Sequence, residues 1–277
     1  MRILCLGYSY SGRHLSRHFF GHQVWFLSRR AASLKEQGVP ALEESDFAEY
    51  IERHPPDAVV DTVPAIPKEE GGIEDPPYWP LLEELLKSRP ETPMVHVSST
   101  SVYPAGAEEA ASSDGLPTYN EASEAAPGKA RGLLRLLLER KWIGFHHSIR
   151  IVRSGGIYGP DRCLALRFRR GDFRRIGTGN KMVSRVHVDD LCRVILASAQ
   201  RQENKAVRLV NAVDARSTLN SEVFRWIEEE LDIIVPGDWR QAAPRGRQVT
   251  SLYLPGMIGG RYRFPTYKEG FRDCLSA

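Results

Sequence analysis

Short apolar runs alternate with segments of helical periodicity along the first part of the chain. The runs have the length and composition of buried strands, and they lie at residues 1–6, 24–27, 57–61, 93–97 and 145–153. Apolar residues recur with helical spacing at 15–19, 81–87 and 129–141, and Ser45 has the side chain of an N-cap for a further short helix. Strands that alternate with helices predict an α/β fold with a doubly wound parallel sheet and right-handed crossovers.

A glycine-containing turn, Gly7-Tyr8-Ser9-Tyr10-Ser11-Gly12, follows the first apolar run. Strand, glycine turn, helix and strand form the plan of a Rossmann-type dinucleotide-binding unit. Gly7 would let the chain leave the strand sharply, and Gly12 would let the helix pack closely on the sheet. Backbone N–H groups at the helix start would face a pyrophosphate. We therefore predict that Gly7, Ser9, Tyr10, Ser11 and Gly12 bind the cofactor; the alternative is a strand–turn–helix without a ligand.

The end of the second strand predicts which dinucleotide binds. A carboxylate at this position favours NAD, because it would bond the ribose 2′-hydroxyl and repel a 2′-phosphate. This chain has Ser28, Arg29 and Arg30 there instead, which offer a hydroxyl and two permanent cations. We predict NADP as the cofactor, with Thr62, Val63 and Pro64 after the third strand completing its site. The alternative is that the two arginines belong to the solvated start of a helix and bind no cofactor.

The pattern changes after about residue 160, where loops and arginines are interrupted by a helix at 187–199, a strand at 207–210 and a helix at 218–231. We predict an NADP-binding Rossmann domain over residues 1–160. Residues 161–277 would form a smaller substrate-binding lobe interleaved with the last sheet elements. In this lobe Arg162, Arg175, Lys181 and Arg185 are candidate contacts for an anionic substrate, and the alternative is that they are solvated.

Composition narrows the class of protein. The chain has 277 residues, is 42% hydrophobic and carries a net charge of only +3. No apolar run approaches the ~20 residues of a membrane span, and the first residues have the pattern of a core strand, so we expect no signal peptide. The four scattered cysteines form no CxxC pair, so we expect a reduced, cytoplasmic protein without a metal site or membrane contact. The basic run from Arg167 to Arg175 fits a solvated surface, an anionic ligand or nucleic acid, but no nucleic-acid-binding signature accompanies it, so we predict no nucleic-acid partner.

Several later motifs extend the glycine turn into a family signature. They are Val97-Ser-Ser-Thr-Ser-Val-Tyr103, Arg153-Ser-Gly-Gly-Ile-Tyr-Gly-Pro160, Val186-His-Val-Asp-Asp-Leu191 and Tyr262-Arg-Phe-Pro-Thr-Tyr-Lys-Glu-Gly270. With these motifs in this order, the chain resembles the extended short-chain dehydrogenase/reductase superfamily over almost its whole length. It is most similar to the atypical NAD(P)-dependent epimerase/dehydratase-like members.

The resemblance implies a catalytic serine, tyrosine and lysine, but this chain has no tyrosine at the position that the family's motif requires. In the family the tyrosine transfers the proton, the lysine lowers its pKa and holds the nicotinamide ribose, and the serine polarises the substrate oxygen. Ser99 matches the serine and Lys129 the lysine, but Ala125 stands four residues before Lys129. Three explanations stay open: Tyr103 or Tyr119 reaches the site, another group such as Lys129 acts as acid or base, or NADP binds without turnover.

We therefore predict an NADP-dependent oxidoreductase or epimerase-like enzyme that acts on a small hydroxyl or carbonyl substrate of anionic or nucleotide-sugar type. Ser99, Lys129 and Tyr103 are its candidate catalytic residues, and Lys129 also belongs to the cofactor site. The alternative is a non-catalytic NADP-binding sensor, which Ala125 favours. The protein would be a monomer or a homodimer.

Overall fold

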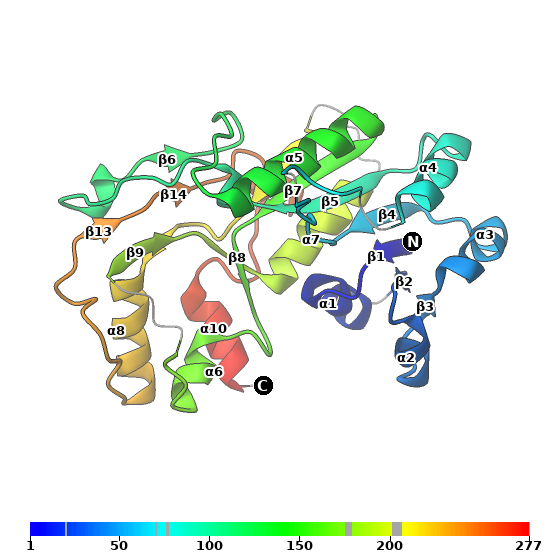
Figure 1. The fold of residues 1–277 in the computed structure, drawn as a ribbon. Coiled ribbons are helices and arrows are strands. Elements are labelled where there is room, and N and C mark those ends of the chain that lie inside the picture. The colour runs from blue at the N-terminus through cyan, green and yellow to red at the C-terminus, as the bar shows by residue number, and fades with distance from the viewer. Residues whose placement is uncertain (20, 70, 76–77, 175–178, 201–206, 277) are drawn as a thin grey trace. The chain divides into compact units, whose positions relative to one another are not determined.

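The computed structural model describes residues 1–19, 21–69, 71–75, 78–174, 179–200 and 207–276. Its main feature is a seven-stranded parallel sheet (Figure 1). In spatial order the strands are β11 (Leu209–Ala212), β7 (Ile149–Ser154), β5 (Met94–Ser99), β4 (Ala58–Asp61), β1 (Arg2–Leu6), β2 (Gln23–Leu27) and β3 (Ala41–Leu42). The order runs outward in both directions from β1 and β4, so the predicted doubly wound Rossmann-type fold is confirmed.

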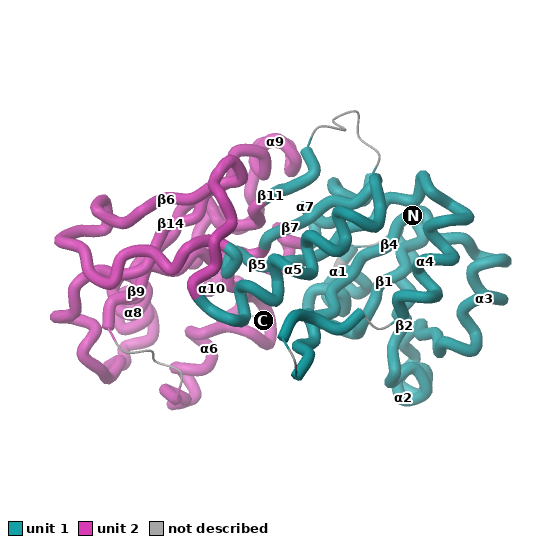
Figure 2. Tube along the Cα trace, turned by 45° about the horizontal axis from the view of Figure 1, so that its top comes forward, with its two compact units in different colours: residues 1–102, 129–153, 192–210 teal, residues 103–128, 154–191, 211–277 magenta. Residues whose placement is uncertain are grey.

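The chain forms two compact units that are interleaved in sequence (Figure 2). Unit 1 comprises residues 1–102, 129–153 and 192–210, and unit 2 comprises residues 103–128, 154–191 and 211–277. Unit 1 contains most of the sheet and therefore the predicted cofactor site. The division into domains at residue 160 stays a prediction.

In unit 1, helices cover both faces of the sheet. They are α1 (Tyr10–His18), α2 (Ala31–Glu36), α3 (Glu44–Arg53), α4 (Trp79–Ser88), α5 (Ala130–Phe145) and the greater part of α7 (Val188–Ala199). On one face, side chains of α3, α4 and α5 such as Phe47, Leu82 and Trp142 share a core with Leu4 and Leu6 of β1. On the other face α1 packs against β1 and β2, and Cys192 of α7 donates to the carbonyl of Ser11 at 3.6 Å.

Unit 2 consists of short elements around an aromatic core. Its strands are β6 (Thr118–Tyr119), β8 (Gly156–Tyr158), β9 (Asn180–Val183), β10 (Arg185–His187), β12 (Thr218–Leu219), β13 (Pro244–Arg245) and β14 (Gln248–Val249). Its helices are α6 (Leu164–Arg169), α8 (Asn220–Leu231), α9 (Leu254–Met257) and α10 (Tyr267–Ser276). Phe168, Phe224, Trp226 and Phe271 are buried members of this core.

Two local predictions are wrong. Ser45 is not an N-cap, because α3 begins at Glu44 and the Ser45 hydroxyl donates to Asp46 at 3.4 Å. The strand expected from residue 145 begins at Ile149, because α5 continues to Phe145, whose ring packs on Trp79 with centroids 4.3 Å apart. Among the described residues, no helix combines the length and the hydropathy that a membrane crossing requires.

Candidate functional site

A pocket of about 490 Å³ lies in unit 1 at the carboxyl ends of β1, β2 and β4. Its size is within the range of small-molecule and cofactor sites. It is lined by Gly7, Tyr8, Ser9, Ser28, Arg29, Arg30, Thr62, Val63, Pro64 and Tyr78. Three separate predictions from the sequence, namely the glycine turn, the Ser28–Arg30 segment and the turn after β4, thus meet in one cavity.

Gly7 and Gly12 allow close approaches that a side chain would prevent. Gly7 has a φ of +76°, and a Cβ there would lie 3.1 Å from Val63 Cγ2 in the turn after the neighbouring strand β4. At Gly12 a Cβ would lie 2.8 Å from Cys5 Sγ and 3.1 Å from the ring of Phe26. The first glycine therefore keeps the pocket open, and the second brings α1 onto the sheet.

Ser9 caps α1 from within the turn. Its hydroxyl accepts the N–H of Gly12 at 3.0 Å and lies 3.2 Å from the hydroxyl of Ser11. No acidic residue lies in the first turn of α1, so the positive end of the helix dipole is not neutralised there. Tyr10, Ser11 and Gly12 form this turn but do not line the pocket, and Ser11 is buried. Their predicted role would be played by backbone N–H groups.

The segment after β2 gives the pocket its charge. Ser28 is buried, and its hydroxyl accepts the N–H of Arg30 at 3.2 Å. Arg29 and Arg30 are exposed at the pocket. The described lining residues include no carboxylate. Because both arginines carry permanent charge, this wall attracts anions.

The turn after β4 is fixed by a buried carboxylate that sequence reasoning missed. Asp61 accepts the N–H of Val63 at 2.9 Å, the indole N–H of Trp142 at 3.0 Å, and lies 2.7 Å from His96 Nδ1. Thr62 donates its hydroxyl to the carbonyl of Leu6 at 2.9 Å. The sequence signal that could have identified Asp61 is an acidic residue at the end of an apolar run. Tyr8 and Tyr78 also line the pocket and were not predicted; Tyr8 stands inside the glycine turn, whereas Tyr78 has no sequence pattern.

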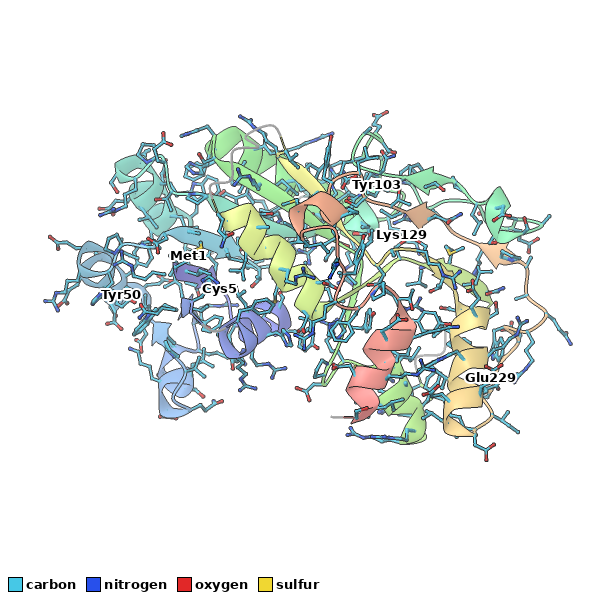
Figure 3. All side chains as sticks on the ribbon, turned by 180° about the vertical axis from the view of Figure 1, so that it is seen from behind. Met1, Cys5, Tyr50, Tyr103, Lys129 and Glu229 are labelled. Atoms are coloured by element: carbon cyan, nitrogen blue, oxygen red, sulfur yellow. The ribbon has the colours of Figure 1, made fainter. Side chains whose placement is uncertain are left out.

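Ser99 and Lys129 lie on neighbouring elements of unit 1. Ser99 ends β5 and is half-buried, and its hydroxyl accepts the N–H of Ser101 at 3.2 Å. Lys129, which is labelled in Figure 3, is the exposed N-cap residue of α5. This helix packs against β5 and the 3-10 turn Thr100–Val102. In a right-handed crossover the helix runs antiparallel to the strands, so its start lies at their carboxyl edge. Both residues therefore belong to the edge that carries the pocket, although neither lines it.

An ion pair holds α5 on the sheet behind these residues. Glu139 and Arg153 are both buried, and the guanidinium Nη2 donates to Glu139 Oε2 at 2.7 Å while Nε bonds both oxygens at 3.1 and 3.2 Å. Ser98, the neighbour of Ser99, donates its hydroxyl to the same carboxylate at 2.5 Å. The charge on Glu139 is thus compensated, and the end of β5 is tied to the middle of α5.

Tyr103 lies in unit 2 and already has partners. The side chain is 1% exposed, and its hydroxyl donates to Asn211 Oδ1 at 2.9 Å. Its ring stacks on Tyr119, with centroids 5.8 Å apart and an interplanar angle of 8°. A phenol that donates to a buried amide oxygen must break that bond before it can protonate a substrate. Among the predicted substrate contacts, Arg185 is buried and bonded to Thr218 at 2.8 Å, and Arg175 lies outside the described residues.

The parallel sheet and the glycine-lined pocket at its carboxyl edge place the protein in the class of Rossmann-type α/β proteins. The chain belongs to the NAD dependent epimerase/dehydratase family, whose sequence model matches residues 3–212. The predicted relationship to the epimerase/dehydratase-like members of the extended short-chain dehydrogenases is thereby confirmed. No curated protein matches the chain.

Solved structures with the same fold cover nearly the full chain. A Methylobacillus flagellatus protein described as an NAD-dependent epimerase/dehydratase is 23% identical, with a TM-score of 0.77 over 99% of this chain and 97% of its own. The dTDP-glucose 4,6-dehydratase of Bacillus anthracis, in complex with NAD, is 14% identical, with a TM-score of 0.72 over 100% and 96%. The UDP-glucuronic acid 4-epimerase of Bacillus cereus, in complex with NAD, is 15% identical, with a TM-score of 0.69 over 100% and 96%. At these identities the likeness is one of fold.

Proposed function

We propose that the protein is an NADP-dependent oxidoreductase or epimerase-like enzyme. The observation that carries the proposal is the composition of the pocket wall after β2. There a buried serine and two exposed arginines face the cavity, and the described lining contains no carboxylate. This wall would bind the 2′-phosphate of NADP through charge-assisted hydrogen bonds, and it offers no carboxylate acceptor for the two ribose hydroxyls of NAD.

The pocket fits the adenosine and pyrophosphate half of such a cofactor. The open turn at Gly7 and the uncompensated start of α1 suit the pyrophosphate. Thr62, Val63 and Pro64 form the wall on the other side of the turn. The dehydratase and the epimerase with this fold hold NAD in their structures. The preference for the phosphorylated form is therefore a property that we assign to this chain's own Arg29 and Arg30.

The chemistry proposed for Ser99 and Lys129 is that of the family's serine and lysine, and their places at the carboxyl edge are compatible with it. When bound, the nicotinamide supplies or accepts a hydride at a hydroxyl or carbonyl carbon of the substrate. The Ser99 hydroxyl would donate to the substrate oxygen, and the Lys129 ammonium would bond the nicotinamide ribose. The substrate would be a small hydroxyl or carbonyl compound of anionic or nucleotide-sugar type. The relatives with solved structures include proteins of dTDP-glucose and UDP-glucuronic acid chemistry.

A second candidate function is a non-catalytic NADP-binding sensor. Two observations favour it: Ala125 replaces the tyrosine expected four residues before Lys129, and Tyr103 is buried with its hydroxyl donated to Asn211. In that case the cofactor site would be retained while proton transfer is lost. We also propose that the protein acts in the cytoplasm as a monomer or a homodimer.

The cofactor preference can be tested by titrating the protein with NADPH and NADH and following nicotinamide fluorescence. We expect tighter binding of NADPH, and a loss of about tenfold or more in NADPH affinity for Arg29→Ala or Arg30→Ala, as for removal of a charged hydrogen bond. Arg53→Ala is the control, because Arg53 pairs with Glu49 on α3 outside the pocket. Tighter binding of NADH by the unmodified protein would contradict the proposal.

Turnover separates the enzyme from the sensor. The NADPH-bound and NADP-bound protein is mixed with a panel of sugar nucleotides and small carbonyl or hydroxyl compounds. The nicotinamide absorbance is followed and the products are separated by chromatography, because an epimerase returns its cofactor unchanged. A change that depends on Ser99 and Lys129 supports the enzyme. Tight cofactor binding without turnover across the panel supports the sensor.

A further inference from the structure

Two buried side chains of α5 fix the position of this helix on the ends of the strands. Glu139 accepts the hydroxyl of Ser98, next to the end of β5, at 2.5 Å, and it also accepts the guanidinium of Arg153, next to the end of β7. Trp142 donates its indole N–H to Asp61, the last residue of β4, at 3.0 Å. The part of α5 that contains Glu139 and Trp142 therefore already lies at the carboxyl edge of the sheet.

The first half of α5 continues past that edge. The other end of the helix lies near the amino end of β5, because His146 Nε2 lies 2.9 Å from the carbonyl oxygen of Thr92. A helix rises about 1.5 Å per residue, so Arg135 lies about 6 Å closer to the start of α5 than Glu139 does. Residues four apart lie on one face, so Arg135 shares the side that Glu139 turns toward the sheet. Arg135 therefore lies beyond the strand ends, where β5 finishes at Ser99 and the following turn packs against α5.

Arg135 is a half-buried cation without a counter-ion. Among the described residues, its guanidinium forms no hydrogen bond and no ion pair. Burial lowers the pKa of Arg135, and the charge of Arg131 acts in the same direction. The carboxylates of Asp61 and Glu139 oppose this effect, but both already accept other side chains. Because an arginine side chain does not lose its proton in proteins, the group stays charged and its N–H donors can bond a ligand.

The start of α5 adds further positive charge that nothing on the helix balances. Lys129 is its exposed N-cap residue, Arg131 is exposed in the first turn, and no acidic residue lies in that turn. Cations at the start of a helix oppose its dipole, and like charges four residues apart destabilise it. This arrangement lowers the stability of the ligand-free protein, whereas a bound anion would compensate it. Residues that reduce stability in this way are typical of functional sites.

We propose that Arg135 binds the nicotinamide half of the cofactor, and that its guanidinium donates to the ribose and phosphate oxygens of that half beside Ser99. The inference rests on the proposed dinucleotide site, and it adds to Lys129 a second cation for the half that the pocket at Gly7 does not hold. Since the guanidinium keeps its proton, Arg135 can orient the nicotinamide but cannot act as an acid or a base. The proton of the reaction must therefore move through another group.

The test compares Arg135→Met with the unmodified protein in calorimetric titrations with NADPH, NADH and adenosine 2′,5′-bisphosphate. We expect the affinity for both dinucleotides to fall by about tenfold or more, as for loss of a charged hydrogen bond. The two losses should be equal, because NADPH and NADH share the nicotinamide half. The affinity for the bisphosphate, which lacks that half, should stay the same. Arg140→Met is the matched control, because Arg140 is an exposed cation on the same helix.

A second readout separates binding from support of the fold. Thermal denaturation of ligand-free Arg135→Met should give a melting temperature equal to or higher than that of the unmodified protein, because the variant removes an uncompensated, half-buried charge. A lower melting temperature with an equal loss of affinity for all three ligands overturns the proposal, and so does an unchanged affinity for both dinucleotides. If the unmodified protein prefers NADH, the proposed NADP preference fails, and the NADH affinity of Arg135→Met still decides the role of Arg135.

Discussion

Asp61 and His96 form a buried pair beneath the cofactor pocket. His96 Nδ1 lies 2.7 Å from Asp61 Oδ2, and the two side chains are 1% and 0% exposed for Asp61 and His96 respectively. His96 Nε2 is also buried and has no hydrogen-bond partner among the described residues. The pair lies on adjacent strands, β4 and β5, and the other oxygen of Asp61 holds the turn that ends at Pro64. A core feature thus sets the shape of one pocket wall.

Replacing Asp61 should therefore loosen the wall and destabilise the fold together. Asp61→Asn removes the negative charge from the side chain that accepts the Trp142 N–H and lies against His96 Nδ1. We expect a loss of about 1–3 kcal/mol in the free energy of unfolding. Urea denaturation measures this loss. Asp57→Asn, at an exposed carboxylate before β4, is the control. A change of less than ~0.5 kcal/mol in Asp61→Asn would show that the carboxylate is not needed for the pair.

Gly12→Ala should separate α1 from the sheet. The added Cβ would lie 2.8 Å from Cys5 Sγ and 3.1 Å from Phe26 Cε1, so the helix must shift, and we expect about 1–3 kcal/mol of destabilisation. Gly144→Ala in α5 is the matched control. A Cβ added at Gly144 would meet no neighbouring atom within 4 Å, so this change should be neutral or stabilising by up to about 1 kcal/mol. Thermal denaturation of both variants compares the two helical glycines directly. Equal effects would contradict the close packing of α1.

Asp214 in unit 2 should make stability depend on pH. Burial raises the pKa of its carboxyl to about 8, against 3.8 as the ordinary value, and the charge of Arg185 and the N–H of His187 offset only part of this effect. Between these two pH values the folded state binds more protons than the unfolded state. The stabilising contribution is therefore complete below about pH 4. It is lost as the pH rises through about 8.

Asp214→Asn removes this titration while keeping an oxygen that can accept the N–H of His187. We expect the variant to show a flatter stability profile between about pH 5 and about pH 9, and to gain stability relative to the unmodified protein at the alkaline end of that range. Glu229→Gln, at an exposed carboxylate on α8, is the control (Figure 3). Parallel profiles for the Asp214 variant and the unmodified protein would contradict the raised pKa.

Lys129→Met should separate function from stability. The side chain is exposed at the start of α5, so its loss should change the free energy of unfolding by less than about 0.5 kcal/mol. If the ammonium bonds the nicotinamide ribose, affinity for the whole dinucleotide should fall, while affinity for adenosine 2′,5′-bisphosphate stays the same. Arg140→Met, an exposed cation farther along the same helix, should alter neither affinity. A loss for both ligands would place Lys129 at the adenosine half instead.

The sequence was sufficient to predict the strands and the parts of the site that depend on a local pattern of residues. Runs such as 57–61 and 93–97 were recognisable as strands because burial on both faces demands continuous apolar residues. The two-residue strands of unit 2 and the short helix α2 have no such pattern, since neighbours distant in the chain hold them. Gly7 and Ser28 could be assigned to one site because parallel strands bring their carboxyl ends together.

Other parts of the site depend on contacts that no spacing reveals. Asp61 meets His96 35 residues later, and Tyr103 meets Asn211 108 residues later. Tyr78 lines the pocket as the N-cap residue of α4, and no pattern in the sequence around it predicts this. The helix that carries Lys129 was predictable from its leucines, but its extension to Phe145 depends on the ring of Trp79.

The two exposed arginines at the pocket also bear on how fast a ligand arrives. Cations at the mouth of a cavity attract an anion before contact and raise its association rate, and dissolved salt screens that attraction. Arg29 and Arg30 would therefore speed the capture of a dinucleotide with an additional phosphate as well as retain it. The association rate of such a ligand would fall with rising ionic strength, more steeply than that of a ligand without the phosphate.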